Sequence, residues 1–390
     1  MNKTNIGKMA AIIPAILLII SCQKQTTSTV KQTDNATRVD MLNRKPSANQ
    51  ATGSWRVYAE GLNNPRGLKF GPDGNLYVAE GGLGGDQSTA GECDQVVSPV
   101  GPYTGSPTGG RISMITSDHV RHTVSDKFPS SQANEIFGGD IEGVADIEWV
   151  NGQLYALLAG AGCSHGVSHS SNGIARVDDD GNWSLIADLS EYQQSHPVAH
   201  PEEDDFEPDG TWYSMINVRG DLYAVEPNHG ELVKVTLAGD ISRVVDISAS
   251  QGHIVPTAIA YHGNFFVGNL HPFPIPGGAS KVLKITPDGT PKDWATGLNT
   301  VLGLVIDKRD RMYVLEMTVP DDDPNTPDFP TPGQGRVIRI DPGGNRTIIA
   351  DGLSLPTGMT MGPDGKLYVS NWGFGPPAKG GGQVLQIDVN

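Results

Sequence analysis

The stretch Pro65–Glu80, P-R-G-L-K-F-G-P-D-G-N-L-Y-V-A-E, returns without a gap at Pro356–Asn371, P-T-G-M-T-M-G-P-D-G-K-L-Y-V-S-N. Nine of the sixteen positions are identical in the two copies. Each copy predicts a β-hairpin, because two short apolar segments flank a Gly-Pro-Asp-Gly turn in which proline presets φ and glycine takes a positive φ. Such a hairpin cannot bury both of its faces alone, so its recurrence predicts a stack of similar units.

Weaker copies of this unit fill the middle of the chain, and every copy has an aromatic residue at the same position of its second strand. The four weaker copies are Val144–Leu158, Tyr213–Glu226, Pro256–Asn269 and Val301–Glu316. The six aromatic positions are Tyr77, Tyr155, Tyr223, Phe266, Tyr313 and Tyr368. Each unit continues through a glycine-rich loop into a third apolar strand, and a fourth should follow, which favours an all-β fold.

The last unit ends after its third strand, so its fourth strand has to come from elsewhere. The segment Trp55–Leu62, W-R-V-Y-A-E-G-L, resembles Asp351-Gly352-Leu353 and the strand before it. A strand from the N-terminal side would complete the sixth unit and leave no open sheet edge. The sequence therefore predicts a six-bladed β-propeller closed by its N-terminal strand.

The first 54 residues indicate export and a tether. Two lysines precede an apolar run, Met9–Ile20, which is too short to span a bilayer comfortably. The run leads into Ile19-Ile20-Ser21-Cys22, which resembles a bacterial lipobox with Cys22 as the acylated residue. A plain signal peptide cut nearby is the alternative. We expect a lipoprotein signal peptide at 1–21, a lipid-anchored flexible tether at 22–54, and a propeller at 55–390 that faces the periplasm or cell surface.

The chain is acidic, with a formal net charge of −16. Residues 1–21 hold two lysines and no acidic residue, so the mature protein would carry −16 − 2 = −18. An acidic surface disfavours nucleic acid and anionic lipid, and it is compatible with cationic ligands or a divalent metal. The need for solubility explains the same charge equally well.

Long loops gather on one face of the predicted propeller. The loops between second and third strands include Gly81–Gly110 with Cys93, Gly160–Asn172 with Cys163 and His165, and Leu270–Ser280 with His271. Because these loops emerge on the same face, Cys93 and Cys163 of neighbouring blades can meet, and an exported compartment permits a disulfide; two free thiols are the alternative. We expect ligand-binding residues such as His165 and His271 on this face.

A set of oxygen-bearing side chains ends five of the six second strands, three residues after the aromatic position. The five are Glu80, Glu226, Asn269, Glu316 and Asn371; the sixth position is Leu158. A ring of such residues around a central shaft predicts a site for Ca²⁺ or another divalent cation. The alternative is that they bond loop backbone. Arg66 is the one cation at the shaft rim, where it could pair with Glu80 or hold an anionic ligand.

Several of these features together resemble one family. They are the lipobox, the entry Asn63–Leu68, the turn Gly71–Gly74, the long loop Glu80–Gly110 with Cys93, and Asp146-Ile147-Glu148-Trp149. The combination resembles the ScyD/ScyE family of NHL-like propellers over Trp55–Asn390. The resemblance implies an exported six-bladed propeller and brings no set of catalytic residues. Thr211-Trp212-Tyr213 stands where such proteins often have Asn-Pro-Tyr.

Two classes of function fit the sequence. The first is a membrane-tethered propeller that binds a small molecule, glycan or protein on its loop-rich face. The second is a metal-dependent hydrolase or lactonase, by distant likeness to gluconolactonase propellers, in which a shaft cation activates water. The sequence favours binding, because no acid–base pair stands out.

Overall fold

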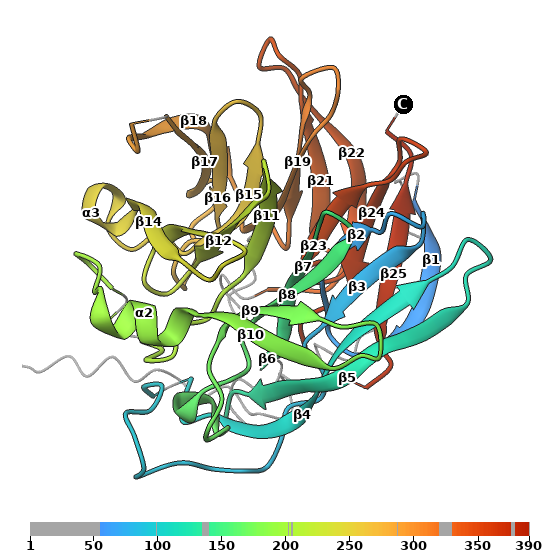
Figure 1. Cartoon of the computed structure of the whole chain (residues 1–390). Coiled ribbons are helices and arrows are strands. Elements are labelled where there is room, and N and C mark those ends of the chain that lie inside the picture. Colours follow the sequence, from blue (N-terminus) through green and yellow to red (C-terminus); the bar gives the residue numbers. More distant parts are fainter. Residues whose placement is uncertain are drawn as a thin grey trace, which may run out of the picture.

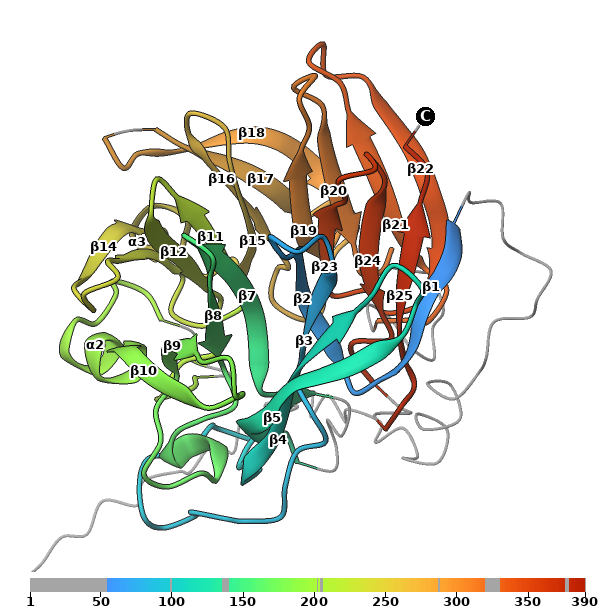
Figure 2. The same ribbon diagram turned by 45° about the vertical axis from the view of Figure 1, so that its right-hand side comes forward.

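The computed structural model describes residues 55–389, except residues 99, 135–139, 202, 204–205, 287, 320–329 and 376–378. The predicted signal peptide, Cys22 and the predicted tether lie outside this part of the chain. Six antiparallel sheets stand around a central axis (Figure 1; Figure 2). The first strands of successive sheets contact one another in a closed circle, which places them innermost. The fold is the predicted all-β, six-bladed propeller.

The six blades follow the order of the chain. Blade 1 contains β2 (Pro65–Phe70), β3 (Leu76–Glu80), β4 (Thr104–Ile115), β5 (Arg121–Gln132) and β6 (Ile141–Glu142). Blade 2 contains β7 (Val144–Val150), β8 (Gln153–Leu158), β9 (Gly173–Val177) and β10 (Trp183–Asp188). Blade 3 contains β11 (Ser214–Val218), β12 (Asp221–Glu226), β13 (Glu231–Val235) and β14 (Ile241–Asp246). Blade 4 contains β15 (Pro256–Tyr261), β16 (Phe265–Asn269), β17 (Ser280–Ile285) and β18 (Pro291–Leu298). Blade 5 contains β19 (Val301–Ile306), β20 (Met312–Glu316), β21 (Gly335–Ile340) and β22 (Arg346–Leu353).

Blade 6 joins the two ends of the described chain. Its strands are β23 (Gly358–Met361), β24 (Leu367–Asn371), β25 (Gly382–Ile387) and, outermost, β1 (Trp55–Leu62). β1 runs antiparallel to β25, with Trp55 opposite Ile387 and Leu62 opposite Gly382 (Figure 1). The Trp55 indole also donates a hydrogen bond to the Asp351 carbonyl in blade 5, at 2.9 Å. The predicted closure by the N-terminal strand is confirmed.

The repeated turn owes its shape to its own residues. Gly74 has a φ of +81°, which a residue with a Cβ adopts only under strain. The Tyr77 hydroxyl donates to the Asp73 carboxylate at 3.0 Å, and Tyr368 makes the same bond to Asp364 at 3.1 Å. The aromatic residue that marks each unit in the sequence therefore also fixes the turn in these two copies.

The hydrophobic core lies between neighbouring sheets. One cluster joins Tyr155 of β8 to Met215 and Val233 of blade 3, and another joins Tyr313 of β20 to Leu385 of β25. Burying one such aliphatic or aromatic side chain stabilises a fold by about 1.5–3 kcal/mol. Because the clusters span sheet boundaries, each blade depends on both of its neighbours.

Blade 1 departs most from the predicted pattern. Its third strand, β4, begins at Thr104, inside the loop that the sequence predicts at Gly81–Gly110, and pairs with β5 as far as Gln132 through several bulges. β5 then pairs with the two-residue strand β6, so the hairpin extends onto the loop-rich face. The described residues also contain short helical segments that the sequence does not predict: η2 (Cys163–His165), α2 (Leu189–Ser195) and α3 (Ser248–Gln251). Within the described residues, no helix is long and apolar enough to cross a membrane.

Removing β1 should destabilise the ring far more than removing the residues before it. A protein that starts at residue 63 would leave the N–H and C=O groups of β25 unpaired along one edge, and we expect it to aggregate or melt at a clearly lower temperature. A protein that starts at Trp55 is the matched control. Thermal unfolding and size-exclusion chromatography with light scattering would measure both; equal melting temperatures would contradict closure by β1.

Candidate functional site

The polar residues that end the second strands each hold the segment that enters their own blade. Glu80 accepts the backbone N–H of Asn63 at 2.6 Å, and Glu226 accepts that of Thr211 at 2.9 Å. Equivalent bonds run from Asn299 to Glu316, from Ser354 to Asn371, and from Asn269 to the Ile254 carbonyl. We call this contact the entry clamp. It corresponds to the alternative in which these residues bond loop backbone.

Each clamping glutamate has a basic side chain beside it. Arg121 contacts both carboxylate oxygens of Glu80, at 2.7 and 2.9 Å, and Arg336 lies 2.5 Å from Glu316. Glu226 lies 3.4 Å from His229 Nδ1. Burial would raise the pKa of Glu226, but His229 and the backbone N–H groups around the carboxylate bring that pKa below its usual value. The buried negative charges are therefore compensated inside each blade.

The structure does not gather the predicted ring. Within the described residues, Glu80, Glu226 and Glu316 form no cluster with metal-ligand spacing. The physical reason is that the shaft is lined by the first strands, whereas these residues belong to second strands, which lie about 4.8 Å further out. Arg66 does not pair with Glu80 either. Its guanidinium lies 3.6 Å from Asp140 and donates to the Ile141 carbonyl at 2.5 Å.

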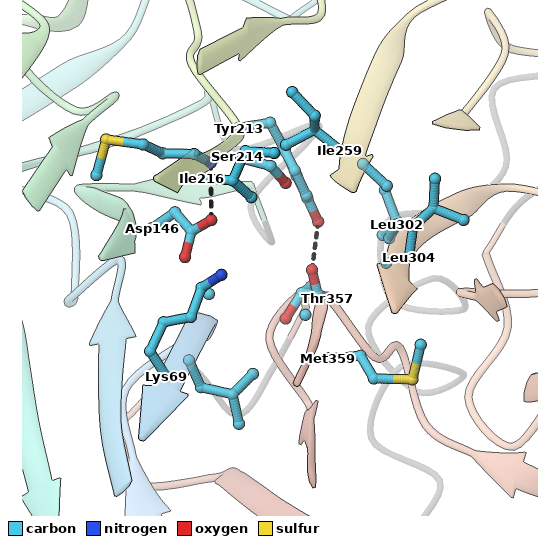
Figure 3. A pocket seen from close by; sticks show the side chains of 16 residues that line it. Lys69, Asp146, Tyr213, Ser214, Ile216, Ile259, Leu302, Leu304, Thr357 and Met359 are labelled. Atoms are coloured by element: carbon cyan, nitrogen blue, oxygen red, sulfur yellow. Dashed lines mark hydrogen bonds between the residues drawn. The ribbon is translucent and has the colours of Figure 1, made fainter. Parts of the chain in front are cut away.

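The shaft itself is nearly filled. The first strands leave a free volume of about 40 Å³, which is room for water and too little for a sugar-sized molecule. Figure 3 shows the Tyr213 side chain extending across this space, where its hydroxyl donates to the Thr357 carbonyl of blade 6 at 2.8 Å. Lys69 and Asp146 face the same space, and the Lys69 ammonium lies 3.1 Å from Glu148.

Asp146 is the one shaft carboxyl with a strongly raised pKa among the described residues. Burial raises its pKa to about 6, although Lys69 and the backbone N–H groups of Met215 and Ile147 act in the opposite direction. Its Oδ2 accepts the Met215 N–H at 2.8 Å, so Asp146 links blade 2 to blade 3.

The predicted disulfide is present on the loop-rich face. Cys93 and Cys163 are joined by an S–S bond of 2.10 Å, which connects the long loop of blade 1 to η2 of blade 2. The two histidines predicted for this face are not brought together. His165, in η2, is fully buried, whereas His271 lies after β16 in blade 4, with its Nδ1 2.9 Å from the Pro272 carbonyl.

His165 instead belongs to a buried cluster with two glutamates that the sequence analysis missed. Its Nδ1 lies 3.3 Å from Glu142 Oε2, and its Nε2 lies 3.4 Å from Glu207 Oε2. Each residue of the trio can offer a ligand atom within 4.8 Å of the others, and it is the one such group among the described residues. Burial lowers the pKa of His165 to about 4, while Asp209 and the Gly210 backbone act against the shift.

Little in the sequence pointed to the two glutamates. Glu142 belongs to β6, a two-residue strand that exists only because β5 extends to meet it. Glu207 stands in the acid-rich run 201–209, where any of several carboxylates could have been chosen. The one usable signal is His165, whose place in a long loop predicts a ligand-binding residue but does not indicate its partners.

A pocket of about 570 Å³ opens beside the disulfide, between blades 2 and 3. Its described lining is Cys93, Asp94, Cys163, Gln193, Gln194, Pro197, Val198, Pro201, Phe206, Pro208, Asp209 and His229. The volume is within the range of about 300–1,000 Å³ that is typical of small-molecule sites. The pocket and the buried cluster are neighbours, because Phe206 and Pro208 line the pocket on either side of Glu207.

Asp146 should make the stability of the protein depend on pH. A carboxyl with a folded pKa near 6 binds protons more tightly in the folded state, so ionisation destabilises the fold as pH rises from about 4 to 7. Asp146→Asn cannot ionise and keeps an oxygen for the Met215 N–H. Relative to this variant, the wild type should lose about 2–3 kcal/mol of unfolding free energy over that range. Urea unfolding at several pH values tests this, and parallel pH profiles would contradict it.

Comparison with known proteins supports the fold but does not identify an activity or a ligand. Neither a model of a known protein family nor a curated protein sequence matches this chain. Among solved structures, a Thermus thermophilus protein assigned as a glucose dehydrogenase is similar with a TM-score of 0.53 and 15% identity, over 86% of this chain and 99% of that one. A gluconolactonase from Xanthomonas campestris has a TM-score of 0.50 and 10% identity, over 86% and 89% of the two chains. At these identities the likeness establishes a shared six-bladed propeller architecture.

Proposed function

We propose that this protein is an exported, membrane-tethered propeller that binds a small molecule on its loop-rich face, in the pocket beside the Cys93–Cys163 disulfide. The observation that carries the proposal is the pocket of about 570 Å³ on that face, compared with about 40 Å³ in the shaft. A scaffold that has its long loops and a pocket of this size on one face is expected to present its binding site there.

The lining of the pocket indicates the chemistry of the ligand. Pro197, Val198 and Phe206 supply an apolar wall, while Gln193 and Gln194 supply amide groups for hydrogen bonding. Two acidic residues, Asp94 and Asp209, also line the pocket, and none of its described lining residues is Lys or Arg. A neutral or cationic small molecule with an apolar face, a glycan fragment included, suits this lining better than an anion does.

The walls of the pocket are held before any ligand arrives. The disulfide fixes one side, and α2, which begins after its N-cap Asp188, fixes another. Asp209 accepts hydrogen bonds from both the backbone N–H and the hydroxyl of Ser164, each at 2.7 Å. A pre-organised pocket loses little conformational entropy on binding, which favours affinity.

The tether is the second part of the proposal. It is supported by the lipobox-like sequence that ends at Cys22, by the aromatic-free segment 23–54, and by the resemblance to ScyD/ScyE propellers. The protein would then have two partners: a bacterial membrane, held through the lipid at Cys22, and a soluble ligand, bound in the pocket of the propeller.

A metal-dependent hydrolase or lactonase is the second candidate. It is supported by the Glu142–His165–Glu207 cluster next to the pocket, since such ligands could hold a divalent cation that activates water. Assaying D-glucono-δ-lactone hydrolysis with added Ca²⁺, Mn²⁺ or Zn²⁺ tests this candidate. Metal-dependent turnover would favour it over simple binding.

The binding site can be tested with fluorescent probes that differ in charge. We expect neutral Nile red and cationic rhodamine 6G to bind with a Kd of about 1–100 µM, and anionic 8-anilinonaphthalene-1-sulfonate to bind far more weakly. Gln194→Trp places a large side chain in the pocket and should abolish binding of the first two. Glu191→Trp, on the same helix but outside the pocket lining, is the matched control. Equal binding by both variants would show that the probes bind elsewhere.

Acylation at Cys22 predicts where the protein is found in a cell. Wild-type protein should fractionate with membranes and be released by detergent, because a lipid chain at Cys22 would hold it there. Cys22→Ala should leave the folded domain outside the membrane fraction. Unchanged fractionation of this variant would contradict the lipid anchor.

A further inference from the structure

The trio Glu142, His165 and Glu207 comes from three separate segments of the chain. Glu142 lies in β6 of blade 1, His165 in η2 of blade 2, and Glu207 in the segment that enters blade 3. The side chains are almost completely buried: that of His165 is 0% exposed, that of Glu207 4% and that of Glu142 10%. Bringing two carboxyl groups together at such a depth is costly unless something compensates their charge.

The distances in the cluster do not fit a set of strong hydrogen bonds. The two imidazole–carboxylate distances are 3.3 and 3.4 Å, compared with about 2.7–2.9 Å for a charge-assisted hydrogen bond. The two carboxylates face different nitrogens of the ring, and one ion can bind only one of these nitrogens. The possible ligand atoms of the three residues all lie within 4.8 Å of one another, so an ion held by His165 Nε2 and Glu207 has Glu142 close enough to join them.

The two nitrogens of His165 have different surroundings. Nδ1 lies 3.1 Å from the Ser131 hydroxyl, which can orient the ring. Nε2 is fully buried and faces Glu207 without a hydrogen bond of ordinary geometry among the described residues, although the Gly210 backbone also interacts with the ring. A metal-binding histidine typically has one nitrogen fixed by a hydrogen bond and the other directed at the ion. Ser131 and Nε2 of His165 reproduce that arrangement.

The carboxylates are also oriented from behind. The Tyr103 hydroxyl lies 3.3 Å from Oε1 of Glu207, and the Thr211 hydroxyl donates to Oε1 of Glu142. In both cases the other oxygen, Oε2, is the one that faces the imidazole. Such supporting contacts are a regular feature of metal sites, because they fix the direction of the ligand atoms.

From this geometry we propose that Glu142, His165 and Glu207 bind a transition-metal dication of the Zn²⁺ type. One imidazole nitrogen and two carboxylates suit Zn²⁺, Mn²⁺ or Co²⁺, whereas Ca²⁺ prefers six to eight oxygen ligands. The dication would add to Arg66, which already interacts with Glu142, in balancing the charge of the two carboxylates. This site differs in residues and position from the predicted shaft ring.

The position of the site indicates what the metal does. The Glu207 side chain is directed into the cluster, while its neighbours Phe206 and Pro208 line the 570 Å³ pocket. A metal at the cluster would therefore fix that wall of the pocket through Glu207. This consequence rests on the proposed function, because it assumes that the pocket binds a ligand.

Metal analysis of the purified folded protein tests the site. After dialysis against a chelator and then against Zn²⁺, the wild type should retain one zinc per chain, and zinc should raise its melting temperature. Co²⁺ in place of Zn²⁺ should give the intense visible absorption bands of a tetrahedral site. His165→Gln and Glu207→Gln should weaken zinc binding by at least about 100-fold. His271→Gln, which alters a histidine of blade 4 outside both the cluster and the pocket lining, should keep the zinc.

Two results would overturn the site. One is wild-type protein that retains no Zn²⁺, Mn²⁺ or Co²⁺; the other is zinc binding by His165→Gln at wild-type strength. The wild-type zinc count and Co²⁺ spectrum remain decisive if the variants fail to fold.

Probe binding distinguishes the metal site from the proposed ligand-binding function of the pocket. Zinc removal that weakens Nile red binding supports the role in the pocket wall, and zinc removal without effect overturns that role. A wild type that binds zinc but no probe overturns the proposed function and leaves the metal site standing.

Discussion

A buried side chain at the end of a second strand, bonded to the backbone of the segment that enters the same blade, is the interaction on which this propeller depends. It turns the loose connection between two blades into a fixed one at the face where the long loops emerge. In blade 1 it takes three elements: Glu80 of β3, the N–H of Asn63, and Arg121 of β5. The arginine matters as much as the bond, because an uncompensated buried carboxylate would destabilise the blade by several kcal/mol.

Blade 2 is the exception, and the candidate site lies there. Its second strand ends in Leu158, which cannot clamp an entry segment. The segment is held instead from the other side, where Glu142 of β6 pairs with Ser131 of β5, and by the Ala159 N–H, which donates to the Gly143 carbonyl at 2.8 Å. Releasing the entry segment from the usual clamp leaves the Glu142 side chain directed at His165. The extended β4–β5 hairpin of blade 1 and the Glu142–His165–Glu207 cluster therefore belong to the same departure from the pattern of the other blades.

The fold was predictable from the sequence because its signals are local and repeated. A turn such as Asp73-Gly74 and an aromatic such as Tyr77 recur in similar form, and a missing fourth strand at one end of the chain pointed to β1 at the other. The disulfide was predictable for a similar reason, since equivalent loops of neighbouring blades emerge on one face.

The site was less predictable, because it depends on which strand a residue belongs to and on contacts between distant segments. Glu80 was correctly placed at a strand end, but a second strand stands one position away from the shaft, so its side chain serves its own blade. The trio joins three segments with no common motif, and Glu142 reaches it only through the bulged extension of β5, which no periodicity in the sequence reports.

The filled shaft and the open rim are two results of the same packing. The apolar first strands, Tyr213 bonded across to Thr357, and the Lys69–Glu148 ion pair occupy the axis, and this leaves about 40 Å³ there. Contacts across the axis tie blade 3 to blade 6 and add rigidity where six sheets meet. A rigid centre allows the rim to vary, because a loop such as that of Cys93 can lengthen without disturbing the strands beneath it. The chain packs its side chains tightly along the central axis and leaves a pocket among the long loops between blades 2 and 3, so a ligand site is expected there and not in the shaft.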